Sequence, residues 1–258
     1  MQKSVMYFWK DQVLLIGEPI ETCEHQHYAI QISIDLSRMC ESQESKQWQT
    51  YSALIIAPNY PHQIGGLGSF QATLLIEPDT KLGQLIVSQY LKESSIREIN
   101  LSLLEKQLVE FKKYLTKKKS CCVARKFSEY LLQQLLGSPS LPKGLDSRIQ
   151  QALKLIKESH SLDVTSGFIA HQLDLSESRF THLFKDELNI PLRRYLLWLR
   201  LIKATRLLLS EHSFTSVAHE VGFSDGAHLS RTFKKMFGLT PTEVFKNSEN
   251  VQAISCLK

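Results

Sequence analysis

The sequence predicts a multidomain chain of α and β structure, with a small antiparallel β-barrel at the N-terminus and an all-α domain at the C-terminus. Three observations predict this fold class. Short β-rich runs separated by turn residues occupy roughly the first eighty residues. Helical periodicity then replaces them, and one residue pattern occurs twice in roughly the last hundred residues. At 258 residues, the chain is long enough for more than one buried core.

The N-terminal strands are predicted from four apolar runs punctuated by proline, glycine and asparagine. These runs are residues 13–16, 29–34, 53–56 and 72–76. Four or more strands in so short a span predict a small antiparallel barrel or sandwich. We assign this barrel to residues 1–80.

The following residues, 81–136, contain few helix breakers and are predicted to be helical. Five apolar side chains there recur in alternating steps of three and four, which forms a seam suited to a helix partner. They are Leu101, Leu104, Leu108, Phe111 and Leu115. The seam can serve a dimer interface or pack on the barrel, and both interpretations stay open. Residues 137–144, rich in glycine, serine and proline, are predicted to be a linker to a helical domain at 145–248.

The repeated pattern occupies residues 169–177 and 217–225, 48 positions apart. The second residue of each copy is an alanine, which lets two helices approach closely. Each then has a residue able to take positive φ, Asp174 in the first copy and Gly222 in the second. Ser176 and Ser224 follow, and both are predicted to cap the next helix. The two copies therefore predict two helix-turn-helix motifs.

The helix after each turn is predicted to bury an aromatic stripe and to expose a short polar face. Such a face fits the major groove of DNA, where base edges are contacted by donors and acceptors at helical spacing. The exposed residues are Ser178, Thr181, His182 and Lys185 in the first copy, and Ala227, Ser230, Arg231 and Lys234 in the second.

A long helix, residues 192–209, is predicted between the two motifs, with Pro191 in its first turn. About eighteen residues make a helix of about 27 Å, which would set the two groove-binding helices roughly 34 Å apart, about one turn of DNA. Arg193 and Arg200 share one stripe of this helix and are predicted to contact DNA. Between residues 193 and 237, eight basic residues stand against three acidic ones, which favours phosphate contact.

The stretch from residue 149 to 245 resembles the DNA-binding domain of the AraC/XylS family of transcription regulators. The most specific part is residues 218–241, AHEVGFSDGAHLSRTFKKMFGLTP, and Arg200, Leu201 and Ala204 match the pattern of the linker helix. The resemblance implies two helix-turn-helix units that bind promoter DNA. It places base-contacting positions at Ser178, Thr181, His182, Gly226, Ala227, Ser230 and Arg231.

The N-terminal region resembles the cupin-like sensor domain of many such regulators, through Pro19, His25, His27 and residues 57–62. This resemblance implies a barrel that holds a small effector near His25, His27 and His62. Three imidazoles suit zinc, iron or nickel. The glutamate that cupin enzymes add after the histidine pair is missing, so we predict neither catalytic residues nor a bound metal or cofactor. A barrel that serves only dimerisation and packing stays open.

Together these patterns predict a transcription regulator and not an enzyme. We expect an activator that binds double-stranded promoter DNA as a homodimer, contacts RNA polymerase and responds to a small molecule. Two alternatives stay open: a metal-dependent cupin enzyme with a helical appendage, and a DNA binder without an effector. No signal peptide or membrane-spanning segment is predicted, so we expect a cytoplasmic protein whose five cysteines are reduced.

Overall fold

The computed structural model describes residues 4–35, 40–44, 47–66, 70–100, 110–111, 119–137, 144–159, 164–210, 213–245 and 251–256. The chain forms two compact units. The sheet unit comprises Met1–Pro142 together with Thr232–Lys258, and the helix unit comprises Lys143–Arg231. The division falls within one helix, α9 (Gly226–Phe237), whose first half belongs to the helix unit and whose second half belongs to the sheet unit.

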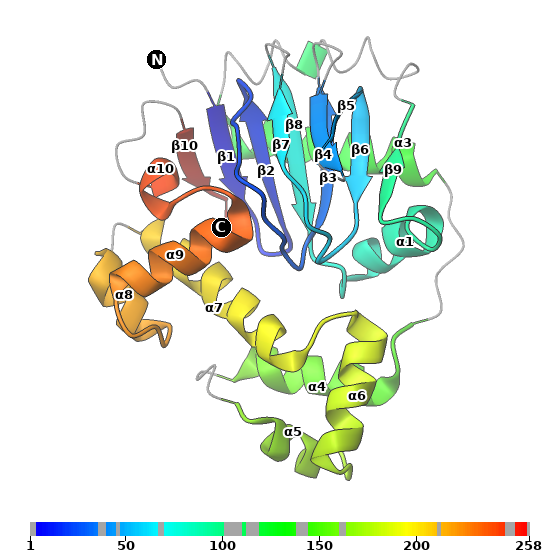
Figure 1. Ribbon diagram of the computed structural model, residues 1–258, viewed down its shortest axis with the longest axis vertical. Helices are drawn as coiled ribbons and strands as arrows, with labels where there is room; N and C mark the ends of the chain where they lie inside the picture. Colours follow the sequence, from blue (N-terminus) through cyan, green and yellow to red (C-terminus); the bar gives the residue numbers. More distant parts are fainter. Residues whose placement is uncertain are drawn as a thin grey trace. The chain divides into compact units, whose positions relative to one another are not determined.

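The sheet unit contains a seven-stranded sheet in the order β10-β1-β2-β8-β3-β6-β9 (Figure 1). Its strands are β1 (Ser4–Phe8), β2 (Gln12–Gly17), β3 (Ile30–Asp35), β6 (Ala53–Ile56), β8 (Gln71–Ile76), β9 (Ile96–Glu98) and β10 (Val251–Ser255). A second sheet has the order β5-β4-β7, formed by β4 (Cys40–Glu44), β5 (Gln47–Tyr51) and β7 (Ile64–Gly66). The four predicted strands are confirmed as β2, β3, β6 and β8.

The prediction of a closed antiparallel barrel is wrong. The large sheet is open, because its edge strands β10 and β9 pair with β1 and β6 and not with each other. The pairing of β1 with β10 is parallel, which is possible because β10 comes from the far end of the chain and needs no hairpin to reach β1. The N-terminal fold is therefore a mixed sheet.

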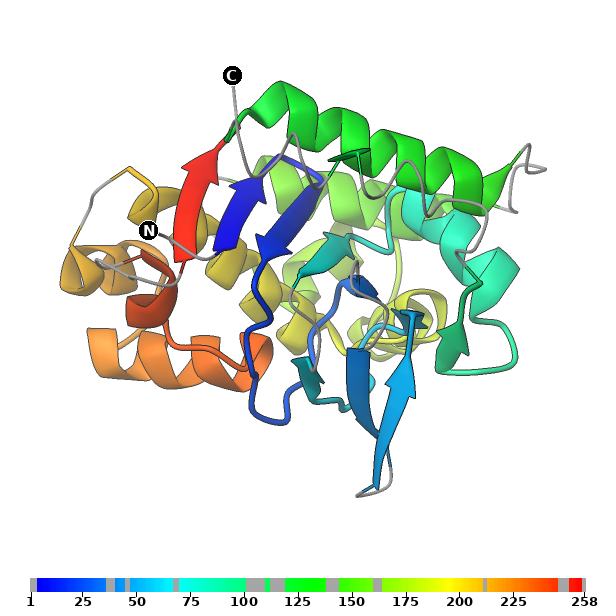
Figure 2. The same ribbon diagram turned by 90° about the horizontal axis from the view of Figure 1, so that it is seen from above.

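Two helices, α1 (Lys81–Tyr90) and α3 (Cys121–Leu136), contribute to the core of the sheet unit. Figure 2 shows α3 lying along one face of the large sheet. Phe127 and Leu131 of α3 are buried in the same apolar cluster as Ile30 and Ile32 of β3. Their spacing of four residues places them on one side of the helix, which is the side that the sheet covers.

The prediction of continuous helix over residues 81–136 is wrong at β9, because its backbone pairs with Leu54–Ile56. Most of the apolar seam at residues 101–115 lies outside the described residues. Its one described member, Phe111, packs on Phe127 and Tyr130, with ring centroids 5.3 and 5.8 Å away. At this position the seam serves packing inside the unit.

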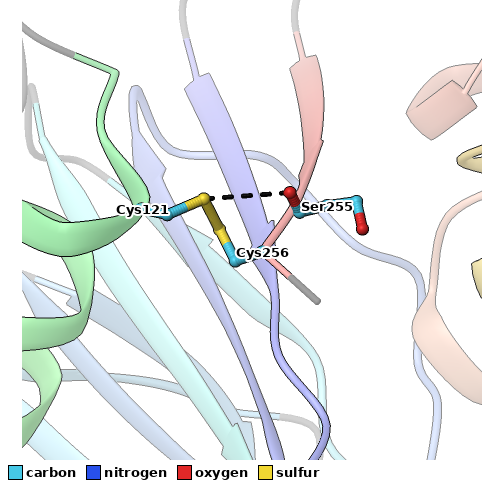
Figure 3. Close-up of a disulfide and its surroundings, with 3 residues drawn as sticks. All are labelled: Cys121, Ser255 and Cys256. Carbon is cyan, nitrogen blue, oxygen red and sulfur yellow. Dashed lines mark hydrogen bonds between the residues drawn. A yellow bond between two sulfur atoms is a disulfide. The ribbon is translucent and has the colours of Figure 1, made fainter. Parts of the chain in front are cut away.

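Cys121 and Cys256 form a disulfide between the first residue of α3 and the residue that follows β10 (Figure 3). Their Cα atoms lie 5.7 Å apart, which is within the ordinary range for a disulfide. The expectation that all five cysteines are reduced is therefore wrong. The sheet brings together two thiols that are 135 positions apart in the sequence.

The helix unit contains α4 (Ser147–Glu158), α5 (Ser166–Gln172), α6 (Glu177–Leu188), α7 (Leu192–Leu208), α8 (Phe214–Glu220) and the first half of α9. The predicted long helix is confirmed as α7, with Pro191 at its N-cap, one position before the first turn. Phe180 and Phe184 of α6 are completely buried, and the Phe184 ring packs edge-on against Tyr195 of α7. Among the described residues, no helix is long and apolar enough to cross a membrane.

The last helix, α10 (Pro241–Phe245), belongs to the sheet unit. Phe245 packs against Phe8 of β1 and against Phe233 in the second half of α9, with ring centroids 6.0 and 5.9 Å away. The sequence-based domain boundaries divide the chain differently, since they keep residues 145–248 together. The structure instead attaches the end of α9 to the unit that carries the β-sheet.

Candidate nucleic-acid interface

Two helix-turn-helix motifs are present, one formed by α5 and α6 and the other by α8 and α9. The turn residues Asp174 and Gly222 have φ values of 52° and 81°, which confirms the prediction of positive φ at both positions. In each turn the alanine carbonyl accepts a hydrogen bond from the residue five positions later. Ala170 accepts from Leu175 at 3.0 Å, and Ala218 accepts from Phe223 at 2.8 Å.

The N-caps of the two second helices differ. The hydroxyl of Ser176 accepts a hydrogen bond from the N–H of Arg179, so Ser176 caps α6 as predicted. In the second motif the N–H of His228 donates to the carboxylate of Asp225 at 2.6 Å. The prediction that Ser224 caps α9 is wrong, because the second copy has one extra residue and Asp225 therefore occupies the cap position.

The N-caps give the correct alignment of α6 with α9. Counted from Ser176 and from Asp225, the second, fifth, sixth and ninth residues correspond. The pairs are Ser178 with Ala227, Thr181 with Ser230, His182 with Arg231, and Lys185 with Lys234. All eight are exposed or half-buried, whereas the residues four and eight positions after each cap are buried.

Gly226 is the first residue of α9 and packs against the neighbouring helix α8. A Cβ at Gly226 would lie 3.8 Å from backbone atoms of Phe214 and Thr215. Arg231 is exposed on the same helix, and its charge is one of the causes that lower the pKa of Asp225. The largest causes are hydrogen bonds to Asp225 from the His228 N–H and the Ser224 hydroxyl.

The two arginines predicted on α7 lie in different environments. Arg193 is exposed near the start of the helix. Arg200 is half-buried, and its guanidinium carbon lies 3.5 Å from the position that a Cβ would take at Gly222. Arg200 therefore packs on the turn of the second motif, a position that supports the turn.

Replacing Gly222 with alanine is expected to lower the free energy of unfolding of the helix unit by about 1–2 kcal/mol. The cost arises from the backbone, because an L-residue is strained at φ 81°, while the added Cβ would meet Arg200 only at ordinary contact distance. Urea unfolding followed by circular dichroism measures the change. The matched control is Asp174→Gly at the equivalent turn position, which should change the free energy by less than about 1 kcal/mol. Equal losses in the two variants would contradict the backbone explanation.

The second group of predicted site residues, His25, His27 and His62, is in the sheet unit. The structure brings the three buried side chains together, with ring centroids 4.3 to 5.5 Å apart. Burial lowers the pKa of His25 to about 4, with the charge of His27 as a further cause. Burial likewise lowers the pKa of His27 and of His62. The three rings are therefore neutral at neutral pH.

The sequence reasoning missed one member of this cluster, Gln31. Its side-chain oxygen lies 3.0 Å from Nε2 of His27 and 3.2 Å from Nε2 of His62. Gln31 is in β3, which is buried on both faces. The available signal was the alternation of polar residues with isoleucines along β3, where Gln31, Ser33 and Asp35 are all buried. A buried amide needs polar partners, which points to a polar cluster beside this strand.

Comparisons with known proteins agree with this geometry. Residues 169–247 match a family model described as a helix-turn-helix domain. The chain is 33% identical over 114 residues to the HTH-type transcriptional activator RhaS of Salmonella schwarzengrund strain CVM19633. The aligned stretch covers 43% of this chain and 41% of RhaS. The same activator from Salmonella arizonae is 32% identical over 114 residues, and the aligned stretch covers 41% of its length. The chain thus spans less than half of the length of the curated relatives it matches.

Similar solved structures extend over most of the chain. Ligand-free ToxT from Vibrio cholerae strain SCE256, in a lysine-to-alanine variant, has a TM-score of 0.59 at 10% identity, covering 91% of this chain and 96% of ToxT. Wild-type ToxT of that strain with a bound unsaturated fatty acid has a TM-score of 0.55 at 12% identity, covering 91% of this chain and 94% of ToxT. At this level of identity the likeness concerns the fold, including the N-terminal β domain.

Proposed function

We propose that this chain is a transcription regulator of the AraC/XylS family that activates transcription by inserting α6 and α9 into two successive major grooves of one promoter site. The observation that carries the proposal is the pair of equivalent polar faces on α6 and α9. Each face is on the second helix of a helix-turn-helix motif whose turn residue has a positive φ. The family is one of transcription factors and not of enzymes.

The two helices present different chemistry at matching positions. α6 offers hydroxyl and imidazole groups at Ser178, Thr181 and His182, whereas α9 begins with Gly226 and Ala227, which have no hydrogen-bonding side chains. We therefore assign most of the sequence specificity to α6. In α9, Arg231 is the long donor suited to guanine, and Lys234 is suited to phosphate. A single chain then binds an asymmetric, directional site.

Replacing Arg231 with alanine is expected to weaken binding to the preferred site by about 1–3 kcal/mol and to relax the preference at one base pair, because a bidentate contact to guanine is lost. The measurement is a binding titration against a set of sites that vary at each position in turn. Lys234→Ala is the matched control, since loss of a phosphate contact should weaken all sites equally and lower the salt slope by about 1. Uniform weakening by Arg231→Ala as well would contradict a base contact.

The sheet unit is the proposed sensor and dimerisation part. The second half of α9 belongs to this unit and packs within it. A conformational change in the unit can therefore reach α9, which we propose to contact DNA. Activation requires contact with RNA polymerase, and access to promoter DNA places the protein in the cytoplasm. An effector-independent DNA binder is the alternative. At a fixed ionic strength, it predicts the same operator affinity with every metabolite tested.

A further inference from the structure

The three histidines of the sheet unit form a preorganised cluster of ligand-type side chains. One ring nitrogen of each lies within 4.8 Å of the other two. His25 and His62 are held by an antiparallel bridge, in which each N–H donates to the other carbonyl at 2.9 Å. The carbonyl of His27 accepts from the N–H of Asn59 at 2.7 Å. Main-chain hydrogen bonds between two separate segments therefore position all three rings.

Hydrogen bonds also determine which ring nitrogen carries the proton. Nδ1 of each histidine lies against a backbone carbonyl: His25 against Cys23 at 2.9 Å, His27 against Ala29 at 2.9 Å, and His62 against Tyr60 at 2.7 Å. A carbonyl only accepts, so each Nδ1 donates, and each neutral ring keeps its lone pair on Nε2. Metal-binding histidines have this arrangement, in which a carbonyl orients the ring through the nitrogen that does not bind the ion.

Gln31 adds an oxygen to the same point. Its Oε1 lies 3.0 Å from Nε2 of His27 and 3.2 Å from Nε2 of His62, while its amide nitrogen donates to the hydroxyl of Ser33 at 3.0 Å. An amide oxygen and two imidazole lone pairs are all hydrogen-bond acceptors and repel one another. A cation bound between them would attract all three. The reversed amide would donate to both rings and satisfy them without an ion, so an ion-binding measurement distinguishes the two arrangements.

The segment that carries His25 also contacts the residue that follows α9. The N–H of Cys23 donates to the carbonyl of Gly238 at 3.3 Å. A Cβ at Gly238 would lie 2.6 Å from Cβ of Thr22 and 2.9 Å from Nδ1 of His25, so the contact is close enough to require glycine. Gly238 has a φ of 71°, and its own N–H donates to the carbonyl of Lys234 in α9. The segment that carries His25 therefore packs directly on the residue that follows α9.

We propose that His25, His27 and His62, together with the side-chain oxygen of Gln31, bind one divalent transition-metal ion, and that this ion is the signal that the sensor part conveys to α9. Three imidazoles and one oxygen suit zinc and its neighbours in the first transition row. Bonds of about 2.0–2.1 Å in a tetrahedral site place the nitrogens about 3.3 Å apart. The rings must therefore close inward from their present separation, which pulls His25 relative to Gly238.

The first test measures binding by the full-length protein, stripped of metal with a chelator and titrated with zinc, cobalt or nickel chloride in a calorimeter. The expected result is one ion per chain, with cobalt giving the visible absorption of a tetrahedral nitrogen and oxygen site. His62→Ala should weaken binding by more than about 100-fold. His171→Ala, which removes an exposed histidine on α5, is the control and should leave binding unchanged. Absence of binding to all three metals, or binding that His62→Ala does not weaken, would overturn the proposal.

A variant that is expected to bind zinc more tightly distinguishes the loss of a metal ligand from misfolding. Gln31→Glu replaces the amide oxygen with a carboxylate at the same place, so the charge attraction should tighten zinc binding by about 10-fold or more. A variant that had lost its fold could not bind more tightly. Unchanged or weaker zinc binding by a folded Gln31→Glu protein would show that Gln31 is not a metal ligand.

The second test concerns the signal and rests on the proposed DNA-binding function. If the ion and DNA are coupled through α9, operator DNA must change the zinc affinity by the same factor by which zinc changes the DNA affinity, about 5–150-fold. Equal zinc affinities with and without DNA would overturn the signalling role. Failure to bind any promoter DNA would instead refute the proposed function, and the zinc titration of the free protein would still report on the site.

Discussion

Replacing Phe184 with alanine is expected to destabilise the helix unit by about 3–5 kcal/mol and to abolish operator binding at moderate temperature. The ring is completely buried and packs edge-on against Phe180 and Tyr195, with centroids 5.7 and 5.5 Å away. Truncation removes its buried area, leaves a cavity between α6 and α7, and breaks two aromatic pairs. Because α6 carries the polar face of the first motif, loss of this packing is expected to disorder the residues that we propose to contact DNA.

The matched control is Phe168→Ala in the same unit. Phe168 has an exposed fraction of 55%, so its truncation should change the free energy of unfolding by less than about 0.5 kcal/mol. Urea unfolding and a DNA-binding titration measure both variants. Comparable losses for the two phenylalanines would contradict the assignment of Phe184 to the core of the motif.

Removing the disulfide by Cys256→Ser is expected to lower the free energy of unfolding of the sheet unit by about 5 kcal/mol. The bond closes a loop of 135 positions, and in the chain-entropy model so long a loop restricts the unfolded chain strongly. It also ties the residue after β10 to the start of α3, and β10 is an edge strand whose one strand partner in the described sheet is β1. Reduction of the wild-type protein should give the same destabilisation.

Cys122→Ser provides the control, because Cys122 is the neighbouring residue, is exposed and is a free thiol. Its unfolding midpoint should equal that of the wild type under oxidising conditions. Thermal unfolding with and without a reducing agent, together with hydrogen exchange of the β10 amides, checks the expectation. A wild-type midpoint that reduction leaves unchanged would show that the closed loop does not contribute to stability.

Local rules were sufficient to predict most of the C-terminal helices. Positive φ at Asp174 and Gly222 follows from the turn that a helix-turn-helix needs, and the structure has it at both positions. The buried and exposed sides of α6 also follow from its own periodicity, since Phe180 and Phe184 are four residues apart and both are buried. These features involve residues that are close in sequence.

The cap of α9 shows where a local rule was applied in the wrong register. Ser224 and Asp225 are both good cap residues. The choice between them depends on where the second helix begins, which the one-residue insertion shifts toward Asp225. The cluster around His25 was predicted in part, because alternation along an extended segment relates His25 to His27. Gln31 was not predicted, although it is only four positions from His27, because its other partner in the cluster, His62, comes from another segment. The packing on Gly238 was not predicted because Gly238 is far from His25 in the sequence.

The helix-turn-helix repeat, the long helix between its copies and the four strands β2, β3, β6 and β8 follow from the sequence alone. Each depends on side-chain periodicity and turn chemistry within a short span. The open sheet became clear from the folded chain, as did two contacts, the pairing of β10 with β1 and the disulfide of Cys121 with Cys256. Those contacts join residues more than a hundred positions apart. They are stabilised by burial and by strand pairing in the folded chain, so they cannot be predicted from a local sequence pattern.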